Sequence, residues 1–204
     1  MHSRFNSASL VLVLVLLLFH VVLPSRPLAD GIEDKIQRIT LKNGLRLLML
    51  ERHLSPTVAL YIRYRAGAVD EADGKTGTAH LLEHMMFKGT RTIGSRNFRE
   101  EESIMGQIEI TGTLLDREKA KGKAAAPERL ANLHAQLSDL QDKQRALTIS
   151  NEIDRLYTEN GAVGLNASTG QDLTTYQVNI PSNKIELWAR IESDRMVNPV
   201  FREF

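Results

Sequence analysis

Apolar and polar residues alternate over three short stretches near the start of the chain, which is the pattern of half-buried β-strands. These stretches are 35–42, 45–51 and 58–65. Asn43 and Gly44 separate the first two stretches and tolerate a positive φ angle, so they predict a tight hairpin turn. On one side of the third stretch lie Val58, Leu60, Ile62 and Tyr64. Three consecutive strands with no helix between them predict an antiparallel sheet with one face available for helices.

The middle of the chain, from about 92 to 150, has a helical pattern instead. Apolar positions recur at alternating spacings of three and four, which is typical of a heptad seam. The seam consists of Leu130, Leu133, Leu137, Leu140, Gln144 and Leu147. A facing stripe consists of Phe98, Met105, Ile108 and Leu115, and Gly122 and Pro127 separate the two. The pattern predicts an antiparallel helical hairpin, which is either a gate or partner arm or a solvated helical excursion with no task.

After this segment, residues 152–159 continue as a helix that Gly161 ends. Stretches 164–169 and 173–180 then predict a second strand pair around Gly170. Pro181 and Ser182 begin a final helix, in which Trp188 is expected to pack on the sheet. The elements together predict an α+β fold, with an antiparallel sheet, helices packed on one of its faces and an inserted helical hairpin.

Composition narrows the function only slightly. The 204 residues carry a formal net charge of +1, with 42% hydrophobic and 25% charged residues, which is an ordinary globular balance. Nothing in the whole-chain charge favours binding to nucleic acid. The chain has no cysteine, so disulfides and cysteine-type zinc sites are excluded.

The first 29 residues predict a secretory signal peptide, followed by the functional part at 30–204. Residues 10–23 form a nearly unbroken apolar run, and a breaker-rich segment follows up to Ala29. The run is too short for a comfortable membrane span and matches the apolar region of a signal peptide, with cleavage near Ala29. We therefore expect a periplasmic or extracellular protein that meets the membrane only through this segment. The alternative is an uncleaved membrane anchor.

The stretch His80-Leu81-Leu82-Glu83-His84 carries the candidate chemistry. On a helix, residues three and four apart lie on one face, so the two imidazoles and the carboxylate would converge. A hydrolytic zinc site needs neutral nitrogens that hold the ion and a carboxylate that takes a proton from the metal-bound water. The order is the inverted form of the commoner zinc-protease motif. The alternative is a helix whose two histidines cap or pack something.

Two blocks of sequence resemble a known family. The first surrounds the histidines and includes Gly74, Gly77, Met85-Met86-Phe87 and Lys88-Gly89-Thr90; the second runs from Gly164 to Thr169 and continues at Thr174-Thr175-Tyr176. From about 36 to 204 the chain is similar to the inverzincins, the pitrilysin family that includes insulysin and the mitochondrial processing peptidases. The resemblance implies the N-terminal lobe of a zinc metalloendopeptidase that hydrolyses peptides or unfolded proteins.

The resemblance also implies roles for individual residues. His80 and His84 would bind Zn²⁺, and Glu83 would be the general base. Asn166 and Ala167 match edge-strand residues that pair with an extended substrate, although Asn166 is alternatively a turn residue at a strand end. Relatives close a second, similar lobe over the substrate, so a second lobe or partner subunit is expected.

A catalytic zinc ion takes three protein ligands, and only two are in hand. Glu159 follows His84 at nearly the spacing that the third ligand has in relatives without the insertion. However, Glu159 and Asn160 match a helix end that does not supply the ligand in those relatives. There the third ligand follows a turn like Asn198–Phe201, so we expect it past residue 204. The chain is then a partial product, inactive alone.

The alternative function is a non-catalytic family member or relic that acts as a binding or assembly subunit. Such subunits usually lose motif residues, whereas His80, Glu83 and His84 are all kept. The sequence therefore favours an enzyme, without specifying its substrate, its cleavage preference or its oligomeric state.

Overall fold

The computed structural model describes residues 31–202. The predicted signal peptide, residues 1–29, lies outside this range. The chain divides into two units, Met1–Ser55 and Pro56–Phe204. Within the described range, no helix combines the length and the apolar character needed to cross a membrane.

The first unit contains a short 3₁₀ helix, η1 (Ile32–Lys35), and a two-stranded hairpin of β1 (Ile36–Thr40) and β2 (Arg46–Leu50). The strands are antiparallel, with Ile36 opposite Leu50. Gly44 has a φ of 87°, and its N–H donates to the carbonyl of Leu41 at 2.9 Å. The predicted turn at Asn43 and Gly44 is therefore confirmed.

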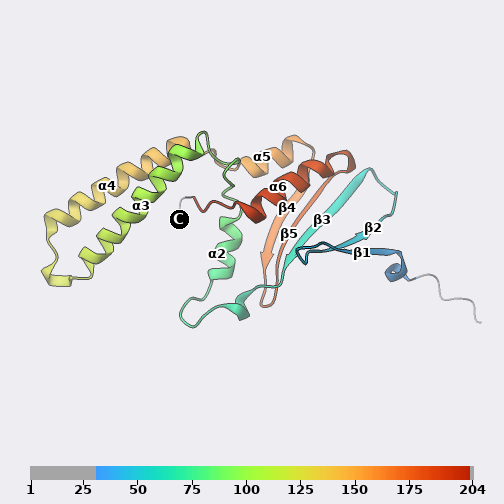
Figure 1. Ribbon diagram of the computed structural model, residues 1–204, viewed down its shortest axis with the longest axis horizontal. Helices are drawn as coiled ribbons and strands as arrows, with labels where there is room; N and C mark the ends of the chain where they lie inside the picture. The colour runs from blue at the N-terminus through green and yellow to red at the C-terminus, as the bar shows by residue number, and fades with distance from the viewer. Residues whose placement is uncertain (1–30, 203–204) are drawn as a thin grey trace, which may run out of the picture. The chain divides into compact units, whose positions relative to one another are not determined.

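The second unit is built on a three-stranded antiparallel sheet in the order β3-β5-β4 (Figure 1). The strands are β3 (Thr57–Tyr64), β4 (Val163–Thr169) and β5 (Thr174–Pro181). The alternation predicted for β3 is confirmed, because every second residue from Val58 is partly buried. The expectation of one sheet from the first three strands is wrong, since β3 pairs with β5 along its whole length and β1 pairs with β2. Pairing with β5 gives the apolar face of β3 a buried neighbour from much later in the sequence.

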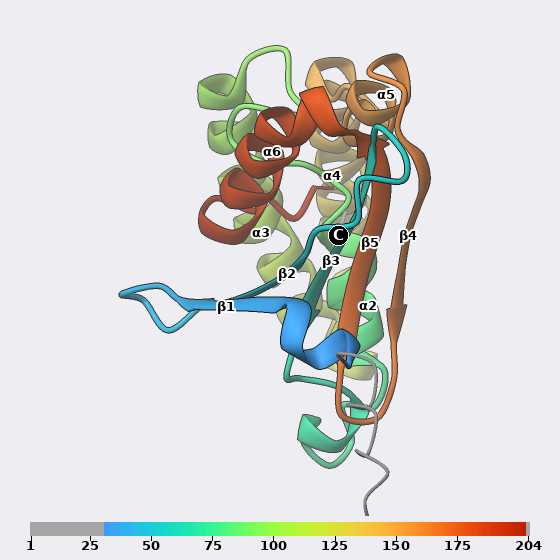
Figure 2. The ribbon, with the colours of Figure 1, turned by 90° about the vertical axis from the view of Figure 1, so that its right-hand side faces the viewer.

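Helices lie against one face of this sheet, as predicted. They are α2 (Thr78–Met85), α5 (Glu152–Glu159) and α6 (Ile185–Val197). The short 3₁₀ helices η2 (Ala68–Asp70) and η4 (Ser182–Lys184) lie in the connections between elements and have no buried residue. The core joins α5, α6 and β5 and consists of Ile153, Tyr157, Ala162, Val178, Ile180 and Ile191. Trp188 packs against this core, as expected. Figure 2 shows α6 beside β5, and α2 runs alongside the opposite half of the same strands.

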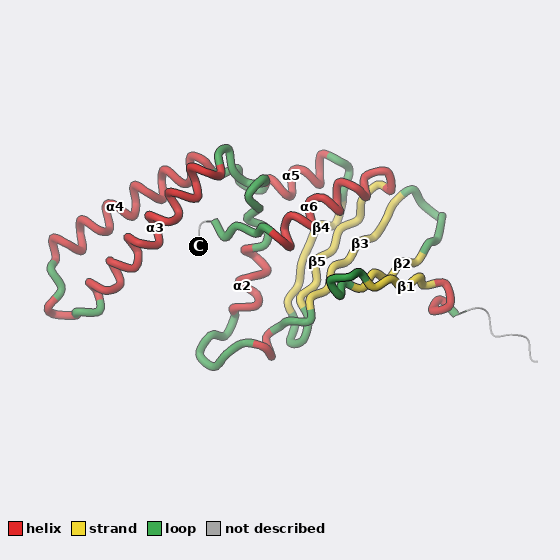
Figure 3. Tube along the Cα trace, viewed as in Figure 1, coloured by secondary structure: helices red, strands yellow, loops and turns green. Residues whose placement is uncertain are grey.

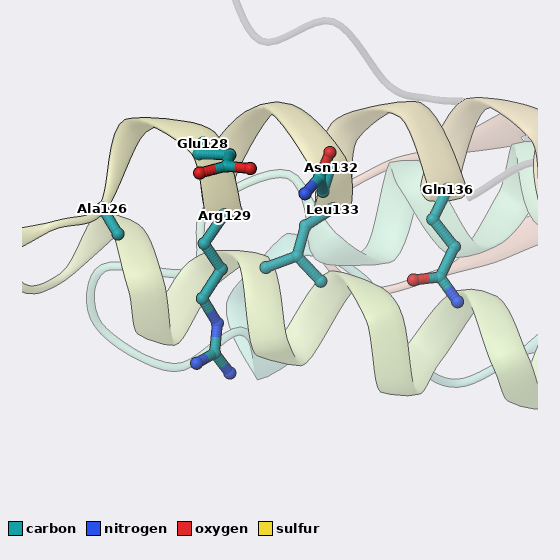
Figure 4. Close-up of a pocket in the computed structure, with 6 residues that line it drawn as sticks. All are labelled: Ala126, Glu128, Arg129, Asn132, Leu133 and Gln136. Atoms are coloured by element: carbon teal, nitrogen blue, oxygen red, sulfur yellow. The ribbon is translucent and has the colours of Figure 1, made fainter.

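The predicted helical hairpin is present as α3 (Phe98–Lys119) and α4 (Pro127–Leu147), joined through η3 (Gly122–Ala124) (Figure 3). On α4 the buried residues Leu133, Leu140 and Gln144 follow the predicted heptad. On α3 the predicted Leu115 is buried, but Met105 and Ile108 are only half-buried and the unpredicted Ile104 is buried. At the tip, Glu118 accepts hydrogen bonds from Lys121 Nζ at 2.7 Å and from the N–H of Ala126 at 2.9 Å. Both hydrogen bonds lower the pKa of Glu118, and the one from Lys121 has the larger effect. An open pocket near the tip is lined by Ala126, Glu128, Arg129, Asn132, Leu133 and Gln136 (Figure 4).

Candidate metal and catalytic site

The helix α2, which carries the candidate residues, is fixed at its first turn by an acidic side chain from the preceding loop. The two carboxylate oxygens of Glu71 accept hydrogen bonds from the N–H groups of Gly77 and Ala79, each at 2.8 Å. Gly77 has a φ of 93°, which a residue with a side chain rarely adopts. Glu71 therefore satisfies two N–H groups that a helix start leaves without partners and places a negative charge at the positive end of the helix.

The two predicted metal-binding histidines lie side by side on α2. Both side chains are exposed, and His80 Nε2 lies 3.1 Å from His84 Nε2. Two nitrogens bound to one tetrahedral zinc ion at about 2.0–2.1 Å would be separated by about 3.3 Å. At this distance one neutral imidazole can donate to the other, and when both present lone pairs a cation can lie between them. The pair therefore fits a shared zinc ion.

Glu83 lies on the same helical turn but faces the sheet. It is only 7% exposed, and its Oε2 accepts a hydrogen bond from Thr169 Oγ1 at 2.5 Å. Met85 is buried, at 6% exposure. Leu81 and Leu82, on the same helix, are 44% and 47% exposed. The buried face of α2 is occupied by a carboxylate that finds its partner on β4.

A cluster of polar and aromatic side chains lies near Glu83, between the sheet and the helix α6. The Tyr176 ring contacts the rings of Phe87 and Tyr64 at centroid distances of 5.8 Å. The Arg195 guanidinium lies 5.0 Å from the Tyr176 ring and is paired with Glu192 at 2.8 Å. Burial raises the pKa of Tyr176 to about 12; Arg195 opposes this rise and the charge of Glu83 adds to it. Tyr176 therefore remains a neutral phenol at physiological pH.

Sequence patterns did not predict this cluster. Glu192 and Arg195 are three positions apart on a helix, a spacing that usually indicates a solvated surface pair. In the structure their side chains are 8% and 2% exposed, and Tyr157 donates to Glu192 Oε1 at 2.6 Å. The only sequence feature that indicated burial of Glu192 and Arg195 was their proximity to the apolar Ile191.

The predicted substrate-binding residues lie inside β4, an edge strand of the second sheet. Asn166 is opposite Gln177, and Ala167 is opposite Tyr176, on β5. Asn166 is exposed, and Ala167 is half-buried. Within residues 31–202, no strand pairs with the other edge of β4. That edge can therefore accept an extended chain.

The described part of the chain does not provide a third metal ligand. No group of three His, Cys, Asp or Glu side chains within residues 31–202 is arranged to hold a metal ion. Glu159 is exposed at the end of α5 and pairs with Arg155 at 3.3 Å. His53 pairs with Glu51 at 3.0 Å, and His134 is exposed on α4. Two imidazoles are thus the donors that this region brings together.

Residues 47–119 match the model of the insulinase family, peptidase family M16. This stretch, which is less than half of the chain, is similar to that family. It includes the whole of α2 with His80, Glu83 and His84, so the predicted resemblance is confirmed. The insulinase-type match continues through α3 and ends at Lys119, before α4 begins.

Two proteins to which this chain is similar are named as zinc proteases. The probable zinc protease PqqL of Escherichia coli is 34% identical over 96 residues, which cover 46% of this chain and 10% of PqqL. The zinc protease PqqE of Helicobacter pylori is 30% identical over 89 residues, which cover 43% of this chain and 20% of PqqE. The chain thus spans a small part of the length of these relatives.

A solved structure shows the same fold. The crystal structure of a protease from Helicobacter pylori aligns with 83% of this chain and 27% of its own, with a TM-score of 0.53 and 20% sequence identity. The predicted α+β class, with helices on an antiparallel sheet, is therefore confirmed.

Proposed function

We propose that this chain contributes the zinc-binding helix and general base of a metalloendopeptidase that hydrolyses peptides or unfolded proteins. The observation that carries the proposal is the 3.1 Å separation of His80 Nε2 and His84 Nε2, with Glu83 on the same turn of α2. The names of the relatives as zinc proteases support the same activity. When bound, zinc supplies a Lewis acid that polarises the scissile carbonyl and acidifies a water molecule.

In this proposal the side chains divide the work. The two imidazoles hold the ion, and each must be neutral to do so. Glu83 accepts a proton from the attacking water and then donates it to the leaving amine. The burial of Glu83 against β4 restricts its carboxylate to a few orientations, which favours proton transfer at one position.

The substrate is proposed to add to the free edge of β4 as an extended strand. Main-chain hydrogen bonds would provide the affinity, and Asn166 and Ala167 would contribute through their backbone groups. Asn166 lies in the interior of β4, which favours this role over that of a turn residue at a strand end. Because an added strand must be extended, peptides and unfolded proteins fit and folded domains do not.

The proposal needs parts that residues 31–202 do not contain. The third ligand is assigned to a residue outside this range or to a partner subunit, and a second lobe would cover the substrate. Until that ligand is present, two imidazoles should bind zinc weakly. We further propose a periplasmic or extracellular location, supported by the apolar run at 10–23 and by PqqL, which is described as a periplasmic protease.

The test compares the whole natural protein, together with any partner subunit, with its Glu83→Gln and His84→Ala variants. Zinc binding is measured by equilibrium dialysis, and hydrolysis is measured with a quenched fluorescent peptide in excess zinc. Glu83→Gln should abolish hydrolysis and keep zinc binding, because the amide cannot accept the proton. His84→Ala should lose both. Hydrolysis that survives Glu83→Gln would rule out the assignment of the base.

A second candidate is a non-catalytic binding or assembly subunit. The lack of a third metal ligand within residues 31–202 favours it. The same assays separate the two candidates. A natural chain that binds extended peptides without cleaving them, even in saturating zinc, would support the binding subunit.

A further inference from the structure

We propose that Thr169 is a positioning residue that holds the Glu83 carboxylate away from the metal-binding imidazoles and towards the substrate strand. The inference rests on the proposed function and deepens it. Thr169 Oγ1 donates to Glu83 Oε2 at 2.5 Å, a contact that joins the last residue of β4 to the middle of α2. Glu83 is 7% exposed, so water has little access with which to replace this hydrogen bond.

The distribution of protons fixes the direction of the hydrogen bond. An ionised carboxylate only accepts, so the single hydroxyl proton of Thr169 goes to Glu83. Thr174 lies beside it, with its Oγ1 3.5 Å from Thr169 Oγ1 and 3.0 Å from the carbonyl of Ala66. The shorter contact takes the Thr174 proton to Ala66. The Thr169 hydroxyl is therefore left to serve Glu83 alone.

The strand β4 places this hydroxyl by its register. Side chains alternate along the strand, and the exposure pattern puts Leu165, Ala167 and Thr169 on the inner face. Thr169 is opposite Thr174 at the closed end of the β4–β5 hairpin, where the N–H of Gly170 donates to the carbonyl of Leu173 at 2.8 Å. The same strand thus offers its edge to the substrate and its inner face to the base.

The consequence concerns the metal as well as the base. Glu83 follows His80 by three positions on α2, a spacing at which side chains are neighbours on a helix, so a released carboxylate can swing towards an ion on the imidazoles. That ion lacks a third ligand within residues 31–202. Without the Thr169 hydroxyl, Glu83 should bind the ion itself. Zinc affinity should then rise while proton transfer fails.

The experiment uses the whole chain with Thr169→Val, which removes the hydroxyl and keeps the shape, and Thr169→Ser, which restores the hydroxyl. Ser168→Ala is the matched control, because Ser168 is the neighbouring residue on the exposed face of β4. Each variant is also made in the Glu83→Gln background. Zinc affinity is measured by competition with a chromogenic chelator, and circular dichroism verifies that each variant is folded.

Thr169→Val should tighten zinc binding by about tenfold, the scale on which residues behind the metal ligands act. Thr169→Ser and Ser168→Ala should leave it unchanged, and the gain should vanish in the Glu83→Gln background. An unchanged affinity in Thr169→Val, or an equal change in both backgrounds, would overturn the proposal. A merely structural role for Thr169 would not produce a gain that depends on Glu83.

Hydrolysis gives the second measurement. If the zinc-loaded chain cleaves a peptide, Thr169→Val should lower kcat by about tenfold or more and leave KM nearly unchanged. An unchanged kcat would contradict the proposal. A natural chain that does not cleave would count against the proposed function alone, because the zinc measurement still decides the role of Thr169.

Discussion

Removing one partner of a buried ion pair is expected to destabilise the second unit strongly, and Arg202→Met tests this. Arg202 and Glu101 are both 0% exposed. Arg202 Nε donates to the two carboxylate oxygens of Glu101 at 2.8 and 3.0 Å. The other guanidinium nitrogens donate to the carbonyls of Lys88, Thr90 and Ile93 at 3.0, 2.5 and 3.2 Å. One side chain thus joins the start of α3 to the loop that follows α2.

The expected loss follows from what remains after the substitution. Arg202→Met leaves the carboxylate of Glu101 buried with no cation, and three carbonyls lose a donor. Removing one partner of a buried ion pair costs about 3–5 kcal/mol. Because the whole unfolding free energy of a domain is about 5–15 kcal/mol, the variant should be severely destabilised. Glu101→Gln should cost less, since an amide oxygen can still accept from Arg202.

Urea denaturation, followed by circular dichroism at neutral pH, measures the loss. The matched control is Arg190→Met on α6, which removes the same group from an exposed pair with Glu186 at 2.7 Å. Both side chains of that pair are more than three-quarters exposed, so the control should change the unfolding free energy by less than about 1 kcal/mol. Equal losses in Arg202→Met and Arg190→Met would refute the argument from burial.

Two further predictions concern acidic side chains that cap helices. The pKa of Glu118 lies below its ordinary value of 4.5, and the hydrogen bond from Lys121 is the largest cause. The ionised Glu118 therefore stabilises the fold above that pH, and this stabilisation is lost as the pH falls through the lowered pKa of the folded state. In urea titrations between neutral and acid pH, Glu118→Gln should lose less stability than the natural chain, and parallel losses would contradict this. Glu71→Ala removes the cap of α2 and should cost about 1 kcal/mol. It should also weaken zinc binding at His80 and His84 in dialysis, and an undiminished affinity would show that the cap does not hold the site.

Much of the fold could be predicted because its signals are local. The turn at Asn43 and Gly44, the alternation in β3 and the heptad seam of α4 each depend on neighbours within a few positions. The pairing of β3 with β5 could not be predicted in this way. It joins strands more than a hundred positions apart, and no local pattern distinguishes that partner from the adjacent hairpin.

In the candidate site, too, the local features could be predicted and the long-range contacts could not. The histidine pair could be predicted because its two members share a helical turn. Thr169 is 86 positions from Glu83, and Arg202 is 101 positions from Glu101. A threonine at a strand end and an arginine after a helix are both common on surfaces, so their types give no hint of burial. Only the fold brings them to their partners.

The geometry of the histidine pair therefore belongs to the whole second unit rather than to the motif. An isolated helix as short as α2, with eight residues, is not stable in water. Its start is held by Glu71, and the loop after its end is held by Asp194, which accepts from the hydroxyls of Thr90 and Thr92 at 2.5 and 2.6 Å. Because α6 supplies Asp194, we expect a change far from the histidines in sequence to alter the support of the loop that follows them. A peptide with the motif alone would lack this support and should not hold the imidazoles at zinc-binding distance.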